Sequence, residues 1–265
     1  MYSGGCVKSL DFMIIGAQKS GTTALSHFLS QHPDVCMATG KEVHLFDAQD
    51  YSHDWTVADI NQRYSRHFEQ AKQSALWGEA TPIYLYWSEI IPALKRYNPS
   101  LKLIVILRDP AERAISHYEM EKSRDNETLP LWLALLRESK RLLSEGKYLG
   151  TSHRCHSYVD RGLYAQQLAC VRHYFNDEQV LVLESDALKY QHAASMEKVC
   201  EFLGIDSAHS IQSERIFSGN YRKRHFSLYY TLIKTCLNWR FRAANVKLKM
   251  LLIEMGITPD WRWLK

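Results

Sequence analysis

A glycine-rich turn between an apolar run and an amphipathic segment is the part of the sequence best suited to chemistry. Residues 12–25 read FMIIGAQKSGTTAL. The glycines let the chain curl tightly, and the first free N–H groups of a following helix would point at an anion. The turn also supplies one cationic and several polar side chains, so we expect it to hold a phosphate or sulfate group. The residues assigned to this anion site are Gln18, Lys19, Ser20, Gly21, Thr22 and Thr23.

This turn differs from the nucleoside-triphosphate loop G-x-x-x-x-G-K-[ST] in the position of its lysine. Gly16 and Gly21 have the required spacing, but Thr22 follows the second glycine and the lysine lies inside the turn, at Lys19. A lysine placed earlier lies nearer the bridging oxygen of a shorter chain, which suits a 5′-phosphosulfate better than a triphosphate. The alternative is an ordinary strand-to-helix connection with one surface lysine.

A second candidate for anion binding follows the most apolar segment of the chain, residues 101–107. Arg108 comes directly after this segment, and Ser116 lies about two turns into a helix expected from Pro110 onward. A guanidinium binds two phosphate oxygens at once, so the pair could clamp a second phosphate. In the alternative, Arg108 pairs with a carboxylate and Ser116 is ordinary helix surface.

The elements that would position these residues form an α/β pattern. Short apolar runs predict five buried strands, at residues 12–15, 35–37, 75–80, 101–107 and 179–184. Helical spacing predicts helices at residues 22–30, from about 57, at 88–97, 162–175 and 195–203, and one that starts at 109 and is followed by a charged helical stretch to about 145. We therefore expect a P-loop-like central parallel sheet of about five strands, with helices on both faces. Ligands of such sheets bind beyond the carboxyl ends of the strands, where several of the polar candidates fall.

Two basic amphipathic helices are expected at the C-terminus, within residues 226–255, with Leu228, Leu232, Cys236 and Trp239 on one side. Between residues 222 and 249 there are eight Lys or Arg and no Asp or Glu, although the net charge of the chain is only +4. Such a block favours anionic ligands, acidic glycans or peripheral contact with a membrane, or it is a solvated helix face.

Length and composition indicate one globular domain over residues 1–265, because 46% of the residues are hydrophobic and 23% are charged. The six cysteines are scattered without a C-x-x-C pair, so we expect neither a disulfide framework nor a metal site. The sequence lacks a basic-then-apolar leader and an apolar window of about 18 residues, so no transmembrane span is expected. These features predict a cytoplasmic protein, unless the chain is an excised lumenal domain, and no nucleic-acid partner.

Taken together, the two anion-binding segments resemble the sulfotransferases that use 3′-phosphoadenosine-5′-phosphosulfate (PAPS). IIGAQKSGTTAL is similar to their 5′-phosphosulfate loop, and LRDPAERAISHY is similar to their 3′-phosphate motif, with Arg108 and Ser116 in the matching places. The segments GLYA at Gly162, QVLVLE at Gln179 and FLG at Phe202 match as well. The resemblance implies PAPS as co-substrate, with Arg108, Ser116 and Tyr164 near its 3′-phosphoadenosine end.

By motif, the heparan sulfate sulfotransferases and their bacterial relatives are the most similar branch. The branch carries its catalytic glutamate in E-V-H-F-F-D, and this chain reads EVHLFD from Glu42. The resemblance implies Glu42 as base, with His44, Asp47 and Glu79 near the acceptor. Ala80 stands where the branch has a lysine that would serve a charged sugar. The late basic loop of the branch is matched by three residues without its glycine, Arg222, Lys223 and Arg224.

The implied reaction moves a sulfuryl group from PAPS to the hydroxyl of a glycan or of a small alcohol, without a metal. Glu42 would take the proton of the acceptor, and Lys19 would stabilise the charge that grows on the leaving bisphosphate. Alone, Glu42 could equally be an exposed loop carboxylate, His44 a packed structural histidine and Tyr164 a core residue. Two other functions stay open. A P-loop kinase would need a lysine after Gly21 and a magnesium carboxylate, and a non-catalytic module would bind anionic polymers or membranes.

Overall fold

Two compact units make up the chain in the computed structural model, which describes residues 8–40, 42–68, 72, 75–145, 151–209, 211–213 and 228–265. The first unit comprises Met1–Leu107 and Cys170–Phe217, and the second comprises Arg108–Ala169 and Ser218–Lys265. The expectation of one domain over residues 1–265 stays a prediction.

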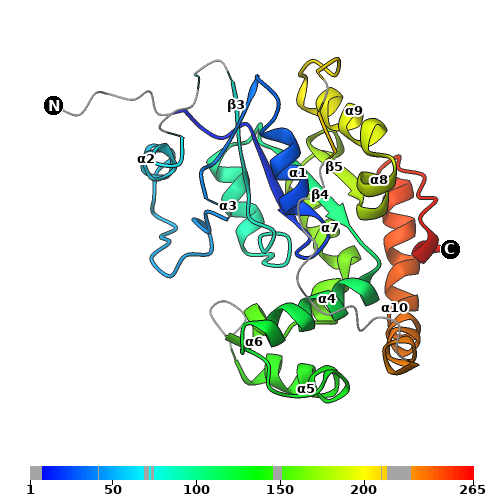
Figure 1. Ribbon diagram of the computed structural model, residues 1–265. Coiled ribbons are helices and arrows are strands. Elements are labelled where there is room, and N and C mark those ends of the chain that lie inside the picture. Colours follow the sequence, from blue (N-terminus) through cyan, green and yellow to red (C-terminus); the bar gives the residue numbers. More distant parts are fainter. Residues whose placement is uncertain are drawn as a thin grey trace. The chain divides into compact units, whose positions relative to one another are not determined.

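A five-stranded parallel sheet forms the centre of the first unit (Figure 1). The strand order is β2-β3-β1-β4-β5, and every neighbouring pair is parallel. Each predicted strand is present within one residue or two of its expected bounds, which confirms the predicted α/β class. The strands are β1 (Phe12–Gly16), β2 (Val35–Met37), β3 (Leu76–Ala80), β4 (Lys102–Leu107) and β5 (Val180–Glu184).

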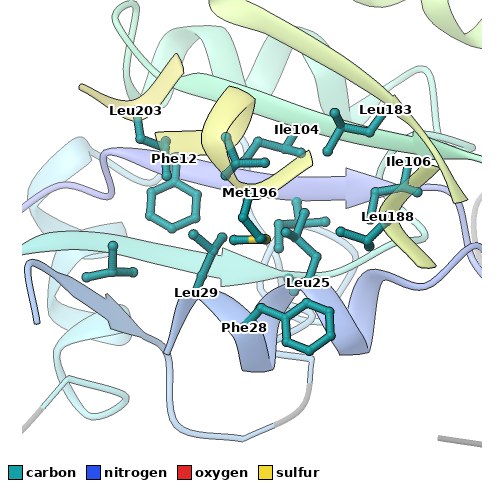
Figure 2. Close-up of a cluster of buried hydrophobic side chains, with 14 residues drawn as sticks. Phe12, Leu25, Phe28, Leu29, Ile104, Ile106, Leu183, Leu188, Met196 and Leu203 are labelled. Atoms are coloured by element: carbon teal, nitrogen blue, oxygen red, sulfur yellow. The ribbon is translucent and has the colours of Figure 1, made fainter. Parts of the chain in front are cut away.

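Helices cover both faces of this sheet. On one face, side chains of α1, α8 and α9 pack against the strands in a continuous apolar cluster around Phe12, Leu25 and Met196 (Figure 2). The strand residues that point the other way, such as Met13 and Val105, are equally buried, as a sheet covered on both sides requires. The helices of this unit are α1 (Thr22–Leu29), α2 (Val57–Ser65), α3 (Ile90–Tyr97), α8 (Ser185–Tyr190) and α9 (His192–Leu203), with a 3₁₀ turn, η2 (Asp177–Gln179).

Local sequence explains where several of these elements begin and end. Thr56 and Asp59 exchange side-chain and backbone hydrogen bonds in a capping box, which fixes the start of α2. Gly204 ends α9 with a φ of 78°, a conformation that glycine adopts without strain. Gly78 of β3 leaves room for the ring of Phe12, since a Cβ there would lie 2.1 Å from the ring.

The second unit is helical and is built around a separate apolar cluster. Residues of α4 such as Ile115 and Tyr118 pack with Tyr158 and with Leu237 and Phe241 of the long helix α10. Its elements are α4 (Pro110–Ser123), α5 (Leu131–Ser144), α6 (Thr151–Cys155), η1 (Asp160–Gly162), α10 (Leu228–Glu254) and η3 (Arg262–Leu264), and α7 (Tyr164–Tyr174) begins in it and ends in the first unit.

One helix prediction for this unit is wrong in detail. The helix expected from residue 109 and the helical stretch that follows it to about residue 145 are α4 and α5, separated where Asp125 adopts a left-handed conformation with a φ of 60° and Pro130 starts a new helix. The two helices expected within residues 226–255 are one, α10.

The predicted apolar side of that C-terminal segment is not the buried one. Leu228, Leu232, Cys236 and Trp239 are exposed, whereas the buried residues of α10 are Tyr230, Ile233, Leu237, Phe241, Leu248 and Leu252. Both faces of this helix carry apolar residues, so spacing alone does not identify the face that packs. Within the described parts of the chain, none of the helices combines the length and the apolar content that a membrane crossing needs.

Candidate active site

The turn between β1 and α1 has the geometry of an anion cradle. Lys19 and Gly21 adopt φ values of 72° and 103°, which curl the chain before the helix begins. Among the described residues, no side chain caps the first N–H groups of α1, and its first turn holds no acidic residue. Those N–H groups and the positive end of the helix dipole therefore suit an anionic ligand.

Ser20 provides a direct test of whether the cradle fits a phosphate group. Its side chain is fully buried, and its hydroxyl has no hydrogen-bond partner among the described residues. A buried hydroxyl without a hydrogen-bond partner destabilises the fold by about 1–3 kcal/mol. A ligand oxygen that accepts a hydrogen bond from Ser20 would offset this cost. Gln18, Lys19 and Thr23 are half-buried and Thr22 is buried beside it, so the turn fits the 5′-phosphosulfate end of PAPS.

After β2, three side chains form a hydrogen-bonded chain in the loop predicted to carry the base. The Nε2 atom of His44 lies 3.0 Å from Oε2 of Glu42, and its Nδ1 atom lies 2.9 Å from Oδ2 of Asp47. The hydrogen bond to Asp47 and then the one to Glu42 raise the pKa of His44 from 6.5 to about 9. The imidazole is therefore protonated at neutral pH and donates to both carboxylates.

Glu79 lies beneath this loop. Its side chain is 0% exposed, with the hydroxyls of Tyr64 and Thr81 donating to its two carboxylate oxygens at 3.1 and 2.8 Å. The Thr81 hydroxyl in turn accepts the backbone N–H of His44 at 3.4 Å. Burial raises the pKa of Glu79 to about 7. In this structure Glu79 supports the loop through Thr81, and the expectation that Glu79 lies near the acceptor stays a prediction.

A hollow of about 320 Å³ connects the cradle to the candidate base. Thr22 and Thr23 line it from α1, Glu42 lines it from the loop after β2, and Ala80 lines it from the end of β3. The described residues around it include no Lys or Arg, and Glu42 is the one carboxylate among them. The remaining lining residues are Ser26, His27, Ser30, Met37, Ala38, Gly40 and Pro82.

The predicted 3′-phosphate residues belong to the second unit. Arg108 follows β4 directly and donates to Glu112 at 2.9 Å, which is the carboxylate pairing that the sequence left open. Tyr164 is buried, and its hydroxyl donates to the carbonyl oxygen of Arg108 at 3.0 Å. It therefore supports the backbone at Arg108, as the core alternative predicts. Ser116 lies half-buried about two turns into α4.

The structure thus assembles the predicted residues in two groups. The cradle and the Glu42–His44–Asp47 chain lie together in the first unit, and Arg108 and Tyr164 are bonded in the second. Arg222, Lys223 and Arg224 lie outside the described residues. Over the described ranges, no group of three or more His, Cys, Asp or Glu side chains is placed to hold a metal ion; the expectation of a metal-free site stays a prediction.

Three supporting residues were not foreseen. Tyr64 and Thr81 hold Glu79, and Lys234 of α10 bonds to Glu112 at 2.6 Å and to Asp109 at 3.2 Å. Thr81 sits in a segment whose glutamate was noticed, so its hydroxyl was a usable signal. Lys234 is 122 residues from Glu112 in sequence, and no local pattern indicates such a pairing.

A parallel sheet with strand order β2-β3-β1-β4-β5, a phosphate-type cradle after β1 and a carboxylate beside it define a sulfotransferase type of domain. The chain matches the sulfotransferase domain family over residues 9–244 and belongs to this family. The resemblance inferred from the sequence is confirmed.

One curated relative and two solved structures show how similar the chain is to individual sulfotransferases. Heparan sulfate glucosamine 3-O-sulfotransferase 6 of Mus musculus is 33% identical over 194 residues, covering 73% of this chain and 52% of the relative. The chain thus spans about half the length of the heparan sulfate 3-O-sulfotransferases it matches. A sulfotransferase of Alicyclobacillus acidocaldarius has the same fold, with a TM-score of 0.77 and 24% identity over 98% of this chain and all of the other. Mouse sulfotransferase SULT7A1, solved with PAP, matches with a TM-score of 0.51 and 15% identity over 94% of this chain and 88% of the other.

Proposed function

We propose that this protein transfers the sulfuryl group of PAPS to the hydroxyl of an acceptor. The observation that carries the proposal is the shared hollow: Thr22 and Thr23 of the cradle and the carboxylate of Glu42 line the same space. An acceptor hydroxyl in that space would meet the base on one side and the sulfuryl donor on the other. Most of the rate enhancement would come from this positioning and from charge stabilisation.

The cradle would hold the 5′-phosphosulfate end of the donor. The N–H groups of α1, the hydroxyls of Ser20 and Thr22, and the ammonium of Lys19 would bind it. The role of Arg108 and Ser116 toward a 3′-phosphate stays the prediction made from the sequence. PAPS supplies the transferable sulfuryl group when it is bound. Lys19 places its charge where the bridging oxygen becomes negative.

In this proposal, Glu42 accepts the proton of the acceptor hydroxyl. A positioned general base typically contributes about 10²–10⁴-fold to the rate. The protonated His44 between Glu42 and Asp47 positions the carboxylate, because a donor fixed at both nitrogens restricts how the loop and the side chain of Glu42 can turn. Glu42 and Lys19 are thus the catalytic residues, and His44 and Asp47 position the base.

We further propose that the acceptor is an uncharged hydroxyl compound, such as a neutral sugar of a glycan or a small alcohol. Ala80 lines the hollow where the resembling branch carries a lysine, and the described lining residues contribute no other full cation. Among the described lining residues, a densely sulfated or carboxylated sugar would meet no Lys or Arg as countercharge, and unpaired charges in a hollow are costly.

The test follows labelled sulfate from PAPS to a panel of neutral glycans, acidic glycans, lipids and small alcohols. We expect transfer to a neutral acceptor, and a loss of about 10²–10⁴-fold in Glu42→Gln, which should still bind 3′,5′-bisphosphoadenosine in calorimetry. Lys19→Ala should lose both transfer and affinity. Glu178→Gln and Lys140→Ala change exposed residues of the same types and serve as matched controls.

Two outcomes would favour the other functions. Tighter binding of ATP with magnesium than of 3′,5′-bisphosphoadenosine would indicate a P-loop phosphotransferase. Retention of an anionic polymer by the wild type and by both variants, with transfer to none of the acceptors, would indicate a binding module.

A further inference from the structure

The long helix α10, whose course is seen in Figure 1, carries exposed apolar side chains opposite the face that it buries. Its buried face, with Ile233, Leu237 and Phe241, packs in the apolar cluster of the second unit. On the other side lies a row of large apolar side chains, each more than half exposed, which we call the apolar stripe. Its members are Leu228, Leu232, Trp239, Val246, Met250 and Ile253.

Helix geometry makes these six residues one continuous surface. At 3.6 residues per turn they fall within an arc of about 60°, and at 1.5 Å per residue they extend along roughly 38 Å of the helix. Trp239 at 79% and Leu228 at 75% are the most exposed members. Single exposed leucines are common, but a contiguous apolar surface of this length marks an interaction site.

The charges beside the stripe identify the kind of partner. Arg240 and Lys247 follow one edge of the stripe and Arg242 and Lys249 follow the other, and all four are exposed. Residues 228–253 contain no Asp or Glu. An apolar strip with Trp and Leu between two rows of Lys and Arg is typical of helices that lie in a membrane interface. The long basic side chains can reach headgroup phosphates while their stems cover apolar surface.

We propose that α10 binds the surface of an anionic lipid bilayer. The apolar stripe would enter the boundary between headgroups and acyl chains, with Trp239 near its middle. The two basic rows would contact lipid phosphates. The inference goes beyond sulfuryl transfer and does not depend on it.

Charge also argues against two other occupants. Pairing the stripe with that of a second copy would bring basic rows against basic rows, and like charges across an interface are unfavourable. An acidic glycan in solution would engage the four cations but would leave the six apolar side chains in water. A partner with an apolar interior and an anionic surface can cover the apolar stripe and also pair with the two basic rows.

Vesicle co-sedimentation of the full chain tests the proposal. We expect binding to phosphatidylcholine vesicles that contain about 30% phosphatidylglycerol, weak binding to phosphatidylcholine alone, and release at about 1 M salt, where the Debye length is about 3 Å. Leu232→Ser combined with Trp239→Ser should lower the partition coefficient at least about tenfold. Arg242→Gln combined with Lys249→Gln should lower it about thirtyfold, since each charge near the surface contributes about fivefold.

Tyr190→Ser is the matched control, because Tyr190 is an aromatic residue of α8 that is 71% exposed. It should bind vesicles like the wild type. All variants should transfer sulfate to an acceptor in solution at the wild-type rate, which separates failure of this proposal from failure of the proposed enzyme. The proposal is overturned by absence of binding to the anionic vesicles or by unchanged binding of the Leu232→Ser, Trp239→Ser double variant. A wild-type dimer that this double variant converts to a monomer would overturn it in favour of a second copy.

Discussion

Replacing His44 by glutamine should remove a stabilising interaction that depends on pH. The pKa of His44 is raised from 6.5 to about 9 by Asp47 and Glu42. The folded protein therefore holds the imidazole proton more tightly than the unfolded chain does. The resulting stabilisation is fully present below pH 6.5 and is lost as the pH rises through about 9.

Solvent sets the size of this effect. A change in pKa from 6.5 to about 9 would correspond to about 3 kcal/mol of unfolding free energy without screening. The side chain of His44 is 39% exposed, so water weakens both ion pairs. We expect about 1 kcal/mol, near the upper end of values measured for exposed pairs.

Urea unfolding of wild type and His44→Gln, at about pH 6 and about pH 10, measures the difference directly. The variant should be less stable by about 1 kcal/mol at the lower pH and nearly as stable as wild type at the higher pH. In parallel, the imidazole NMR resonance that is missing from the variant should titrate near pH 9 in the wild type. The Asp47→Asn substitution should lower that pKa, because the hydrogen bond to Asp47 is the largest cause of the shift.

The same loss of stability in His44→Gln at both pH values would refute the reasoning. It would show that the imidazole stabilises the loop by packing alone. A resonance of His44 that titrates near 6.5 would refute it as well, since the two carboxylates would then not act on the ring.

Three further substitutions test other parts of the first unit. Glu79→Gln should be more stable than wild type by about 1–2 kcal/mol at pH 8 but not at pH 5, in urea unfolding, because burial makes the folded protein hold this proton up to about pH 7. Gly78→Ala should lower the stability by about 1–3 kcal/mol in thermal scans, since its Cβ would meet the ring of Phe12 at 2.1 Å. Ser20→Ala should leave the free protein as stable as wild type or about 1 kcal/mol more stable, yet weaken 3′,5′-bisphosphoadenosine binding about five- to tenfold in calorimetry.

The sheet and the cradle could be predicted because their signals are local. The apolar runs of β1 and β4 are almost free of polar residues, which strands buried on both faces require. The cradle combines a lysine, hydroxyls and glycines within a few residues. The start of α2 is also determined by nearby residues, since Thr56 and Asp59 form its capping box.

The errors come from features that only tertiary contacts decide. The α10 segment has apolar residues on both sides, so its periodicity could not distinguish the buried Leu237 from the exposed Trp239. Glu79 follows the pattern of a strand-end polar residue, but Tyr64 of α2 also binds it, from a part of the chain whose proximity the sequence does not reveal. Long-range polar pairs of this kind have no periodic signal.

The pairing register of β1 and β3 helps to fix the cradle and the Glu42–His44–Asp47 loop in the same unit. Strand β3 pairs with β1 in parallel, with Glu79 opposite Met13 and Ala80 opposite Ile14. Glu79 binds Thr81, which holds the backbone of His44 and thereby the loop that carries Glu42. The end of β1 leads, within a few residues, into the cradle. The loop that carries Glu42 is therefore bonded to the end of β3, the strand that pairs with β1, and a slip of one residue would turn the buried glutamate toward the other face and release the loop.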